Sequence, residues 1–404
     1  MIPFSPPHID QLIIDEVVDT LKSGWITTGP KTKRFEKELA AYCGNPKTLC
    51  INSATAGLEI MLRWFGVTEG DEVILPAYTY SATANVIMHC GAKPVFVDIG
   101  DDFNISSAAV QKAITPKTKV IMPVDFAGYP CNYHELHTII ENPEVRALFT
   151  PATDEQKQLG RILILSDAAH SFGSRYQNKV AGMFTDVTVF SFHAVKNLTT
   201  AEGGAIAFNL PAPFSNDEMY AKLCVTTLHG QNKDALAKTQ PGNWRYDIVE
   251  AGYKMNMTDI MASIGLVELS RYDSMVLPKR KHIFDSYSRA LEKYDWAHLP
   301  RYETTDQTSS FHVYALRIRN CTEAQRDAII ARIFEKQVSV NVHFIPLPMM
   351  SFYKQQGFDI RDYPNTYAHY ANEISLPVYF DLTDEQITLV TEAVIRSVDE
   401  VLKS

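Results

Sequence analysis

Apolar and polar positions along the first third of the chain alternate between two periodicities. In Ile9–Lys22 the apolar residues recur at helical spacing and stop at Ser23-Gly24, which predicts an opening helix. Further helices are predicted over Phe35–Cys43, Thr55–Phe65 and Ser81–His89, and strands over Thr48–Ile51, Glu72–Leu75, Lys93–Val97 and Lys119–Pro123. This alternation predicts an α/β fold in which helices cover both faces of a mostly parallel sheet.

The middle of the chain continues the pattern after one interruption. The apolar runs Ile162–Leu165 and Val187–Phe192 predict two more buried strands. The polar segment Glu141–Gly160 is longer than the ~2–6 residues that usually connect such elements. We interpret it as a surface insertion without a catalytic part, although the sequence leaves open a position at the substrate entrance. A long helical pattern then runs from Thr258 to about Tyr294, with a break expected at Pro278.

The length of 404 residues suits two domains better than one core. A long helix of the kind that begins near Thr258 often carries a chain from a large domain into a small one. The remainder mixes short strands with helices, predicted over Ser310–Ile318, Ser339–His343, Glu323–Lys336 and Asp384–Leu402. We therefore predict a large domain over residues 1–265 and a smaller α+β domain over residues 266–404.

Composition excludes several classes of protein. Hydrophobic residues make up 46% and charged residues 21%, which is typical of a globular protein, and no run approaches the ~18 apolar residues of a membrane span. A net charge of −9 argues against nucleic acid as a partner. The opening MIPFSPPHID lacks the features of a secretion signal, and the six cysteines lack CxxC spacing. We expect a cytoplasmic protein without a metal, a disulfide framework or a membrane partner.

A carboxylate and a lysine follow the two buried strands in the middle of the chain. Asp167 comes after Ile162–Leu165, and Lys196 lies four residues beyond Val187–Phe192. Ligands of open α/β sheets bind outside the carboxyl ends of the strands, so both residues fall where chemistry is usually done. Lysine can hold pyridoxal phosphate as a Schiff base, while an aspartate keeps the pyridinium nitrogen protonated. Taken alone, Asp167 could be a helix cap and Lys196 a solvated surface lysine.

Longer motifs carry a family resemblance. SDAAH (166–170) and SFHAVKNLTTAEGG (191–204) closely resemble nucleotide-sugar aminotransferases of the DegT/StrS type, which are fold-type I pyridoxal-phosphate enzymes. Further motifs appear in the order that this family shows: SGWITTGP (23–30), INSATAGL (51–58), PAYTYSATANVI (76–87), GYKMNMTDI (252–260) and VHFIPL (342–347). The resemblance covers nearly the whole chain.

The resemblance implies three catalytic residues. Lys196 would hold the cofactor and then move a proton between the amino donor and the cofactor. Asp167 would pair with the pyridinium nitrogen, and His170 would lie near the phenolic oxygen. A lone histidine is more often structural, so His170 has a plain alternative.

It also implies a set of cofactor contacts. Ser53-Ala54-Thr55 precedes a predicted helix, and main-chain N–H groups there would bind the phosphate together with Ser191. A simple helix cap is the alternative for this segment. Tyr80 would stack on the pyridine ring, whereas Tyr78 is expected to pack in the core.

The remaining assignments concern a partner subunit and the substrate. Lys254 and Asn256 would reach the phosphate from the partner, and lysine at this place resembles a subset acting on uridine-diphosphate sugars. If so, active sites are shared and the protein is at least a homodimer. The substrate candidates are Trp25, Thr28, Glu202 and His343, with an anchoring role equally open for the first two. A second histidine that relatives often carry corresponds to Pro348 here, and the turn LHG (228–230) lacks an upstream arginine.

These features predict a pyridoxal-phosphate-dependent aminotransferase, with pyridoxamine phosphate as the intermediate form of the cofactor. L-Glutamate would be the amino donor, and a nucleotide-linked, uridine-diphosphate 4-keto-6-deoxy hexose the acceptor, for bacterial surface polysaccharide or glycan synthesis. One alternative is a pyridoxamine-phosphate-dependent sugar dehydratase, but those relatives replace the lysine with histidine. The other is a non-catalytic sensor or structural protein, against which the intact set of Lys196, Asp167 and Thr55 argues.

Overall fold

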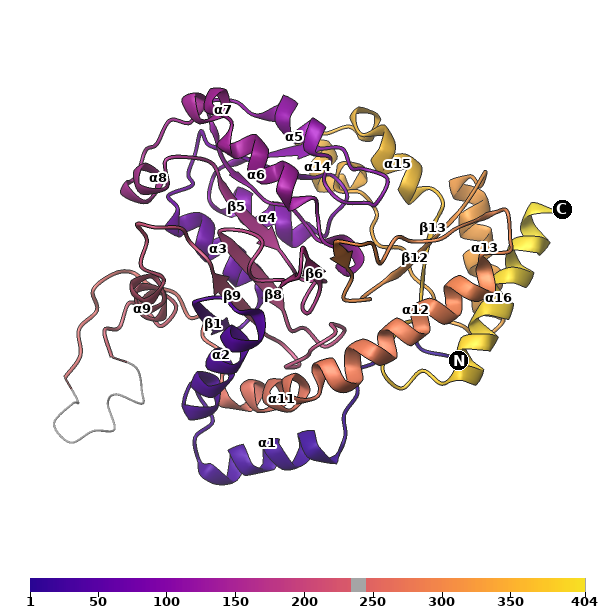
Figure 1. The fold of residues 1–404 in the computed structure, drawn as a ribbon, viewed down its shortest axis with the longest axis horizontal. Coiled ribbons are helices and arrows are strands. Elements are labelled where there is room, and N and C mark those ends of the chain that lie inside the picture. The colour runs from indigo at the N-terminus through magenta and orange to yellow at the C-terminus, as the bar shows by residue number, and fades with distance from the viewer. Residues whose placement is uncertain (234–244, 404) are drawn as a thin grey trace.

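A seven-stranded sheet forms the centre of the larger lobe in the computed structural model, which describes residues 1–233 and 245–403 (Figure 1). The strands are β1 (Lys47–Ile51), β2 (Glu72–Pro76), β3 (Lys93–Val97), β4 (Thr118–Ile121), β5 (Leu163–Asp167), β8 (Val187–Ser191) and β9 (Gly204–Phe208). Their order is β1-β9-β8-β5-β4-β2-β3, and β3, β2, β4, β5 and β8 run parallel. Only β9 runs antiparallel to its neighbours, β8 and β1. The α/β fold with a mostly parallel sheet is confirmed.

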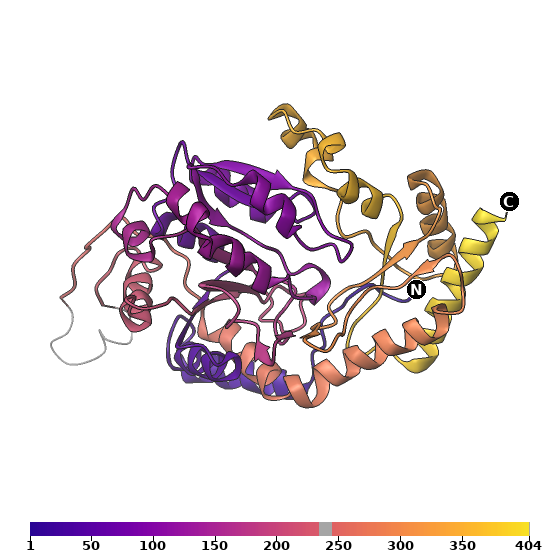
Figure 2. The same ribbon diagram turned by 45° about the horizontal axis from the view of Figure 1, so that its top comes forward.

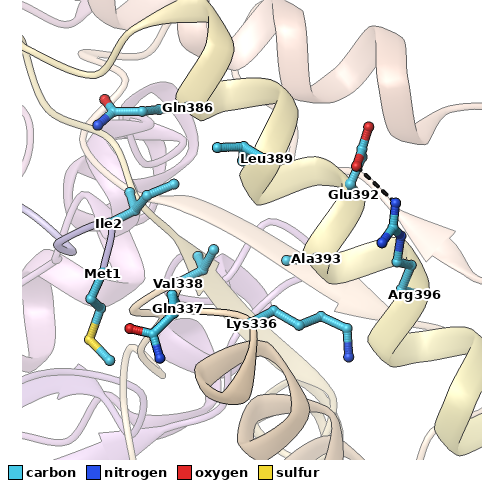
Figure 3. Close-up of a pocket in the computed structure, with 10 residues that line it drawn as sticks. All are labelled: Met1, Ile2, Lys336, Gln337, Val338, Gln386, Leu389, Glu392, Ala393 and Arg396. Carbon is cyan, nitrogen blue, oxygen red and sulfur yellow. Dashed lines mark hydrogen bonds and ion pairs between the residues drawn. The ribbon is translucent and has the colours of Figure 1, made fainter.

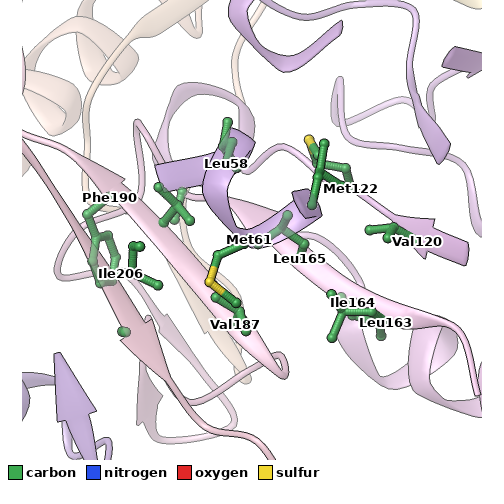
Figure 4. Close-up of a cluster of buried hydrophobic side chains, with 14 of the residues drawn as sticks. Leu58, Met61, Val120, Met122, Leu163, Ile164, Leu165, Val187, Phe190 and Ile206 are labelled. Atoms are coloured by element: carbon green, nitrogen blue, oxygen red, sulfur yellow. The ribbon is translucent and has the colours of Figure 1, made fainter. Parts of the chain in front are cut away.

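The central strands are apolar on both faces because both faces are covered. All five residues of β5 and of β9 are buried, as strands between two layers of helices require. Figure 4 shows Leu58 and Met61 of α3 (Ala54–Trp64) lying over residues of β4, β5, β8 and β9. The apolar cluster so formed fixes the strand ends that position the site.

The larger lobe contains the helices that the sequence predicts, together with several that it does not. They are α1 (Gln11–Ser23), α2 (Pro30–Cys43), α3, α4 (Ser81–His89), α5 (Ser107–Ala113), α6 (Tyr133–Glu141), α7 (Pro143–Leu148), α8 (Asp154–Leu159), α9 (Asn216–Thr226) and α11 (Asp259–Ser270). The prediction that α2 starts at Phe35 was wrong, because it begins at Pro30. The buried Asp259 carboxylate accepts hydrogen bonds from the N–H groups of Gly29, Lys31 and Thr32, at 2.8, 3.0 and 2.9 Å. A carboxylate distant in sequence thus caps this helix end.

The long helical pattern is interrupted before the proline, not at it. A π-helical turn, η2 (Tyr272–Val276), separates α11 from α12 (Leu277–Leu291). Pro278 lies in the first turn of α12, where an N–H would have no partner within the helix, so the expected break there was wrong. Figures 1 and 2 show α11 and α12 running from beneath the large sheet into the smaller lobe. The predicted domain boundary at residues 265 and 266 falls inside α11 and stays a prediction.

The segment Glu141–Gly160 forms α7 and α8 at the edge of the larger lobe (Figure 1). Asn142 and Thr153 cap these helices, and the Gln156 side chain donates to the carbonyl of Phe65 at 2.8 Å. The insertion is therefore a folded part of the surface.

The smaller lobe has its own antiparallel sheet and apolar cluster. Its strands are β10 (Ala297–His298), β12 (Tyr314–Ile318) and β13 (Glu373–Leu376), and α12, α13 (Glu323–Glu335) and α16 (Asp384–Leu402) supply the helical part of the cluster. The helices α14 (Ser351–Gln355) and α15 (Pro364–Tyr370) contact the larger lobe, where Tyr353 donates to Asn85 at 2.6 Å and Thr366 to Asp98 at 2.8 Å. A further small sheet, β11 (Gln307–Thr308) with β6 (Arg175–Tyr176) and β7 (Lys179–Val180), links the smaller lobe to the larger one.

Two predicted strands of this lobe were wrong in extent. Residues 310–313 precede β12 as irregular chain, because Ser310 and His312 donate main-chain hydrogen bonds to Gly128 and Ala127 of the other lobe. Ser339–His343 is not a regular strand: Asn341 pairs with Ser375 through an isolated bridge, and the N–H of Ser339 donates to the carbonyl of Ile2 at 3.0 Å.

The segment that precedes α1 crosses between the lobes, a course visible in Figure 2. Ile2 pairs with Val338 in the smaller lobe, and the ring of Phe4 stacks on His343 with centroids 5.6 Å apart. His8 then approaches Asp381 at 2.8 Å, before α1 packs on α11. Over the described ranges, no helix combines the length and apolar character needed to cross a membrane.

Candidate active site

A cavity of about 350 Å³ opens at the carboxyl ends of β2, β5 and β8. Ten of the residues predicted for the site line it: Ser53, Ala54, Thr55, Tyr80, Asp167, His170, Ser191, Lys196, Glu202 and His343. Strands far apart in sequence therefore bring most of the predicted set to one place, as the strand-end rule anticipates.

Asp167, the last residue of β5, is held in one orientation by its neighbours. The hydroxyl of Thr83 donates to Oδ2 at 2.8 Å, and the N–H of Ala169 donates to Oδ1 at 3.2 Å. Thr79 lies 2.8 Å from the Thr83 hydroxyl. Burial raises the pKa of Asp167, while the hydrogen bonds from Thr83 and Ala169 and the charge of Lys196 oppose the rise. The result is a buried, oriented carboxyl group facing a cavity.

Lys196 lies in the turn after β8, where its N–H donates to the carbonyl of His193 at 2.9 Å. Burial lowers the pKa of its ammonium from the ordinary 10.5 to about 8, and the Asp167 charge opposes that fall. An amine with such a pKa loses its proton readily near neutrality, which suits a nucleophile or a proton carrier.

His170 is a neutral imidazole, and one of its ring nitrogens lacks a hydrogen-bond partner among the described residues. Burial, with Lys196 and His343 nearby, holds its pKa well below the ordinary range. Its buried Nδ1 has no hydrogen-bond partner within residues 1–233 and 245–403. Its ring is stacked 5.9 Å from that of Phe344. Buried polar atoms are almost always paired, so this one points to a bound group beside it.

His312 is a site residue that sequence reasoning missed. It lines the cavity, and its ring centroid lies 4.3 Å from that of His170. Asn197 donates through Nδ2 to the Ser310 carbonyl at 2.6 Å, so its Oδ1 accepts a hydrogen bond from His312 Nδ1 at 2.7 Å. The available signal was a histidine just before the apolar run VYALRI, but its neighbours come from the other lobe.

The start of α3 offers main-chain N–H groups to the cavity. Ser53 caps the helix by accepting a hydrogen bond from the N–H of Ala56 at 3.1 Å, so the capping alternative is confirmed for its side chain. Thr55 is exposed. A Cβ at Gly204 would lie 2.6 Å from the nitrogen of Ala54, so only glycine lets β9 approach this helix start. An anion beside these N–H groups would be favoured.

The two tyrosines after β2 separate as predicted in their burial. Tyr78 is fully buried among aromatic rings of the lobe interface. Tyr80 is 64% exposed at the cavity wall, with its ring centroid 6.0 Å from that of Phe344. Its face is available to a bound ring.

Four predicted residues lie outside the cavity lining. Asn256 donates to the Thr28 hydroxyl at 2.6 Å, and Trp25 donates to the Thr28 carbonyl at 3.1 Å. This cluster anchors the chain between α1 and α2. Lys254 is exposed and pairs through an isolated bridge with Leu228. Within one subunit, therefore, these side chains do not meet the others.

Glu202 and His343 both line the cavity. Glu202 is exposed and lies 3.6 Å from His193, another lining residue. His343 is held by a contact between its Nδ1 and the Ser375 hydroxyl at 2.9 Å. Burial and the charge of Lys196 lower the pKa of His343 to about 4.

A second hollow, on the smaller lobe, contains none of these groups among the described residues (Figure 3). Its two cations are already paired, Arg396 with Glu392 at 3.1 Å and Lys336 with Glu400 at 2.9 Å. Of these two hollows, the cavity lined by Lys196 is therefore the better candidate for the active site.

Comparison with known proteins gives an independent view of the same chain. Residues 7–395 match the DegT/DnrJ/EryC1/StrS aminotransferase family. The spore coat polysaccharide biosynthesis protein SpsC of Bacillus subtilis is 35% identical over 97% of this chain and 96% of its own. Spr1654 of Streptococcus pneumoniae, assigned as a sugar aminotransferase, superposes in its PMP form with a TM-score of 0.96 at 47% identity, over 100% of both chains. Its PLP form gives 0.94 at 46% identity, over 99% of both chains. PseC of Helicobacter pylori, an aminotransferase of pseudoaminic acid biosynthesis, gives 0.85 at 27% identity over 99% of both chains.

Proposed function

Because the chain belongs to the DegT/DnrJ/EryC1/StrS aminotransferase family, we propose that it transfers an amino group from L-glutamate to a nucleotide-linked keto sugar. The family resemblance seen in the sequence is confirmed, and the chain is a sugar aminotransferase that uses pyridoxal phosphate. The acceptor we propose is a uridine-diphosphate 4-keto-6-deoxy hexose, and the product would serve a bacterial surface polysaccharide or glycan. The likeness to a spore coat polysaccharide protein supports that destination.

The observation that carries the proposal is that Lys196, Asp167 and His170, whose Nδ1 has no hydrogen-bond partner among the described residues, meet in one cavity. These groups fit pyridoxal phosphate. When bound, that cofactor supplies an electron sink, which eases removal of a proton from the carbon that bears the amino group. The oriented Asp167 carboxyl would hold the ring nitrogen. The Nδ1 atom of His170 would find its missing hydrogen-bond partner in the phenolic oxygen of the bound ring. The N–H groups at the start of α3, with Ser191, would hold the phosphate.

Lys196 would be the proton carrier. Its pKa of about 8 leaves a useful fraction of the amine neutral at physiological pH, so it can both accept and return a proton. Tyr80 would cover one face of the bound ring from the cavity wall. We assign the substrate side of the cavity to Glu202 and His343.

A second copy of the chain is part of the proposal. The helix α1 exposes a row of apolar side chains, among them Leu12 at 64% and Leu21 at 53% exposure, and a partner subunit would cover such a face. We propose that Lys254 and Asn256 then act at the partner's phosphate, where Lys254 would supply a local cation in a chain of net charge −9.

The alternatives receive less support from the site. A dehydratase would carry histidine in place of Lys196, and a sensor would have no need of an oriented Asp167 beside it. We also propose a reducing, cytoplasmic location, because the six cysteines are scattered along the sequence without the spacing of a disulfide framework.

An absorbance spectrum tests the proposal. The protein as purified should show the visible band of bound pyridoxal phosphate, and L-glutamate should convert it to the pyridoxamine form. Lys196→Ala should abolish that conversion, while Lys117→Ala, at an exposed lysine outside the cavity, should leave it unchanged. Candidate keto sugars can then be ranked by how fast they restore the band. Absence of any band after incubation with pyridoxal phosphate would refute the assignment.

A further inference from the structure

Two buried side chains of β13 connect the cavity to the interior of the smaller lobe. Glu373 and Ser375 are both fully buried. The Ser375 hydroxyl lies 2.5 Å from Glu373 Oε1 and 2.9 Å from His343 Nδ1. The N–H of His343 donates to the second carboxyl oxygen, Oε2, at 3.1 Å. A carboxyl group, a hydroxyl and an imidazole therefore form one continuous chain of hydrogen bonds.

The ring of His343 is fixed with one nitrogen toward this chain. Phe4 stacks on it, His170 meets it edge to face at 6.4 Å, and Ser375 holds Nδ1. This leaves Nε2 as the nitrogen available to the cavity that His343 lines. A hydroxyl can donate only one hydrogen bond, so whichever neighbour Ser375 donates to, the other must donate to Ser375.

We propose that Glu373 and Ser375 form a proton relay with His343, in which the protonation of Glu373 sets which imidazole nitrogen carries hydrogen. When Glu373 is protonated, it donates to Ser375, Ser375 donates to Nδ1, and the hydrogen of His343 sits on Nε2. When Glu373 is a carboxylate, Ser375 donates to it, Nδ1 carries the hydrogen, and Nε2 is bare. Glu373 is thus a positioning residue that acts through Ser375.

The two states differ by one proton, and the imidazole stays neutral in both. If Nε2 gives its proton to a substrate oxygen, Ser375 passes its proton to Nδ1 and Glu373 passes its own to Ser375. The negative charge ends on Glu373. This route explains how a histidine whose pKa is about 4 can still exchange a proton near neutrality. A donor at Nε2 suits a carbonyl or phosphate oxygen, whereas a bare Nε2 suits a hydroxyl.

The surroundings of Glu373 place its ionisation in a useful range. Burial raises its pKa to about 8, opposed by the Ser375 hydroxyl, the His343 N–H and the charge of Arg326. Arg326 of α13 also donates to the main-chain oxygen of Glu373 at 3.2 Å. Tyr78, beyond β2, presents a hydroxyl without a hydrogen-bond partner in the described part of the chain. Arg317 is the register partner of Glu373 on β12, and its guanidinium binds Asp101 at 3.0 Å.

Nitrogen NMR of the cofactor-bound protein tests the relay without any sugar. Histidine is labelled with ¹⁵N, and His343→Gln identifies the His343 signals by their loss. We expect the hydrogen to move from Nε2 to Nδ1 as the pH rises between about 6.5 and 9.5, with a midpoint near the pKa of about 8. The inference rests on the proposed function only in placing His343 beside the substrate, so a relay without amination activity, or the reverse, would be recognisable.

Variants separate the relay from a structural effect. Glu373→Gln removes the titrating group and should lock His343 in one tautomer throughout the range. Ser375→Ala should disconnect His343 from Glu373. Ser397→Ala is the matched control, because it removes another buried hydroxyl of the smaller lobe, on α16, and should leave the titration unchanged. An unchanging tautomer in the native protein, or a titration that persists in both relay variants, would overturn the inference.

Discussion

The lowered pKa of Lys196 predicts how fast the protein takes up its cofactor at each pH. Only the neutral amine attacks the aldehyde of pyridoxal phosphate. A shift from 10.5 to about 8 corresponds to about 3 kcal/mol in favour of the neutral form. At pH 7 about one Lys196 side chain in ten would be neutral, against about one in three thousand for an ordinary lysine, a gain of roughly 300-fold.

The assay mixes cofactor-free protein with pyridoxal phosphate and follows the visible band by stopped flow. The rate should rise with pH and level off above about 8. Lysine acetylated at its α-amino group serves as the control. Its rate profile reports an ordinary side-chain amine together with any titration of pyridoxal phosphate itself. Asp167→Asn removes the charge that opposes the fall, so its midpoint should move to lower pH. A midpoint near 10 in the native protein, or a rise in the variant, would contradict the argument that burial of the amine controls its pKa.

Three further substitutions test other parts of the site and its frame. Thr83→Val removes the hydrogen bond to Asp167, and loss of about 1–1.5 kcal/mol should weaken cofactor binding about tenfold in a fluorescence titration; unchanged affinity would show that the orientation does not depend on Thr83. Asp186→Ala leaves the buried Arg161 with only its half-exposed partner Glu141 among its ion pairs in the described residues, so urea titration should show a loss of about 3 kcal/mol in unfolding free energy, and a loss below about 1 kcal/mol would contradict this prediction. Gly204→Ala places a methyl group 2.6 Å from the first nitrogen of α3; cofactor affinity should fall more than about tenfold, and equilibrium dialysis giving the native value would refute the close approach.

The parts of the fold that were predictable are those that depend on local pattern. The strands β5 and β8 are continuous apolar runs because both faces of the sheet are covered. The rule that ligands bind at strand ends then places Asp167 and Lys196 together without knowledge of the topology.

The parts that were missed depend on contacts between distant residues. The start of α2 is set by Asp259, which no local pattern near Pro30 reveals. The role of Thr83 follows from a hydrogen bond between its helix, α4, and Asp167 at the end of β5. His312 owes its place to the lobe interface, because the chain around it bonds to Ala127 instead of extending β12. Sequence spacing carries no information on such pairings.

The course of the segment before α1 constrains how the molecule is made. Ile2 pairs with Val338, and Phe4 covers His343. During synthesis these N-terminal residues therefore lack their contact partners until the smaller lobe has left the ribosome. The larger sheet, whose strands end at Phe208, can form before that moment. The contact between Phe4 and His343 therefore forms only after the smaller lobe has been synthesised, and the cavity gains its final shape at that stage.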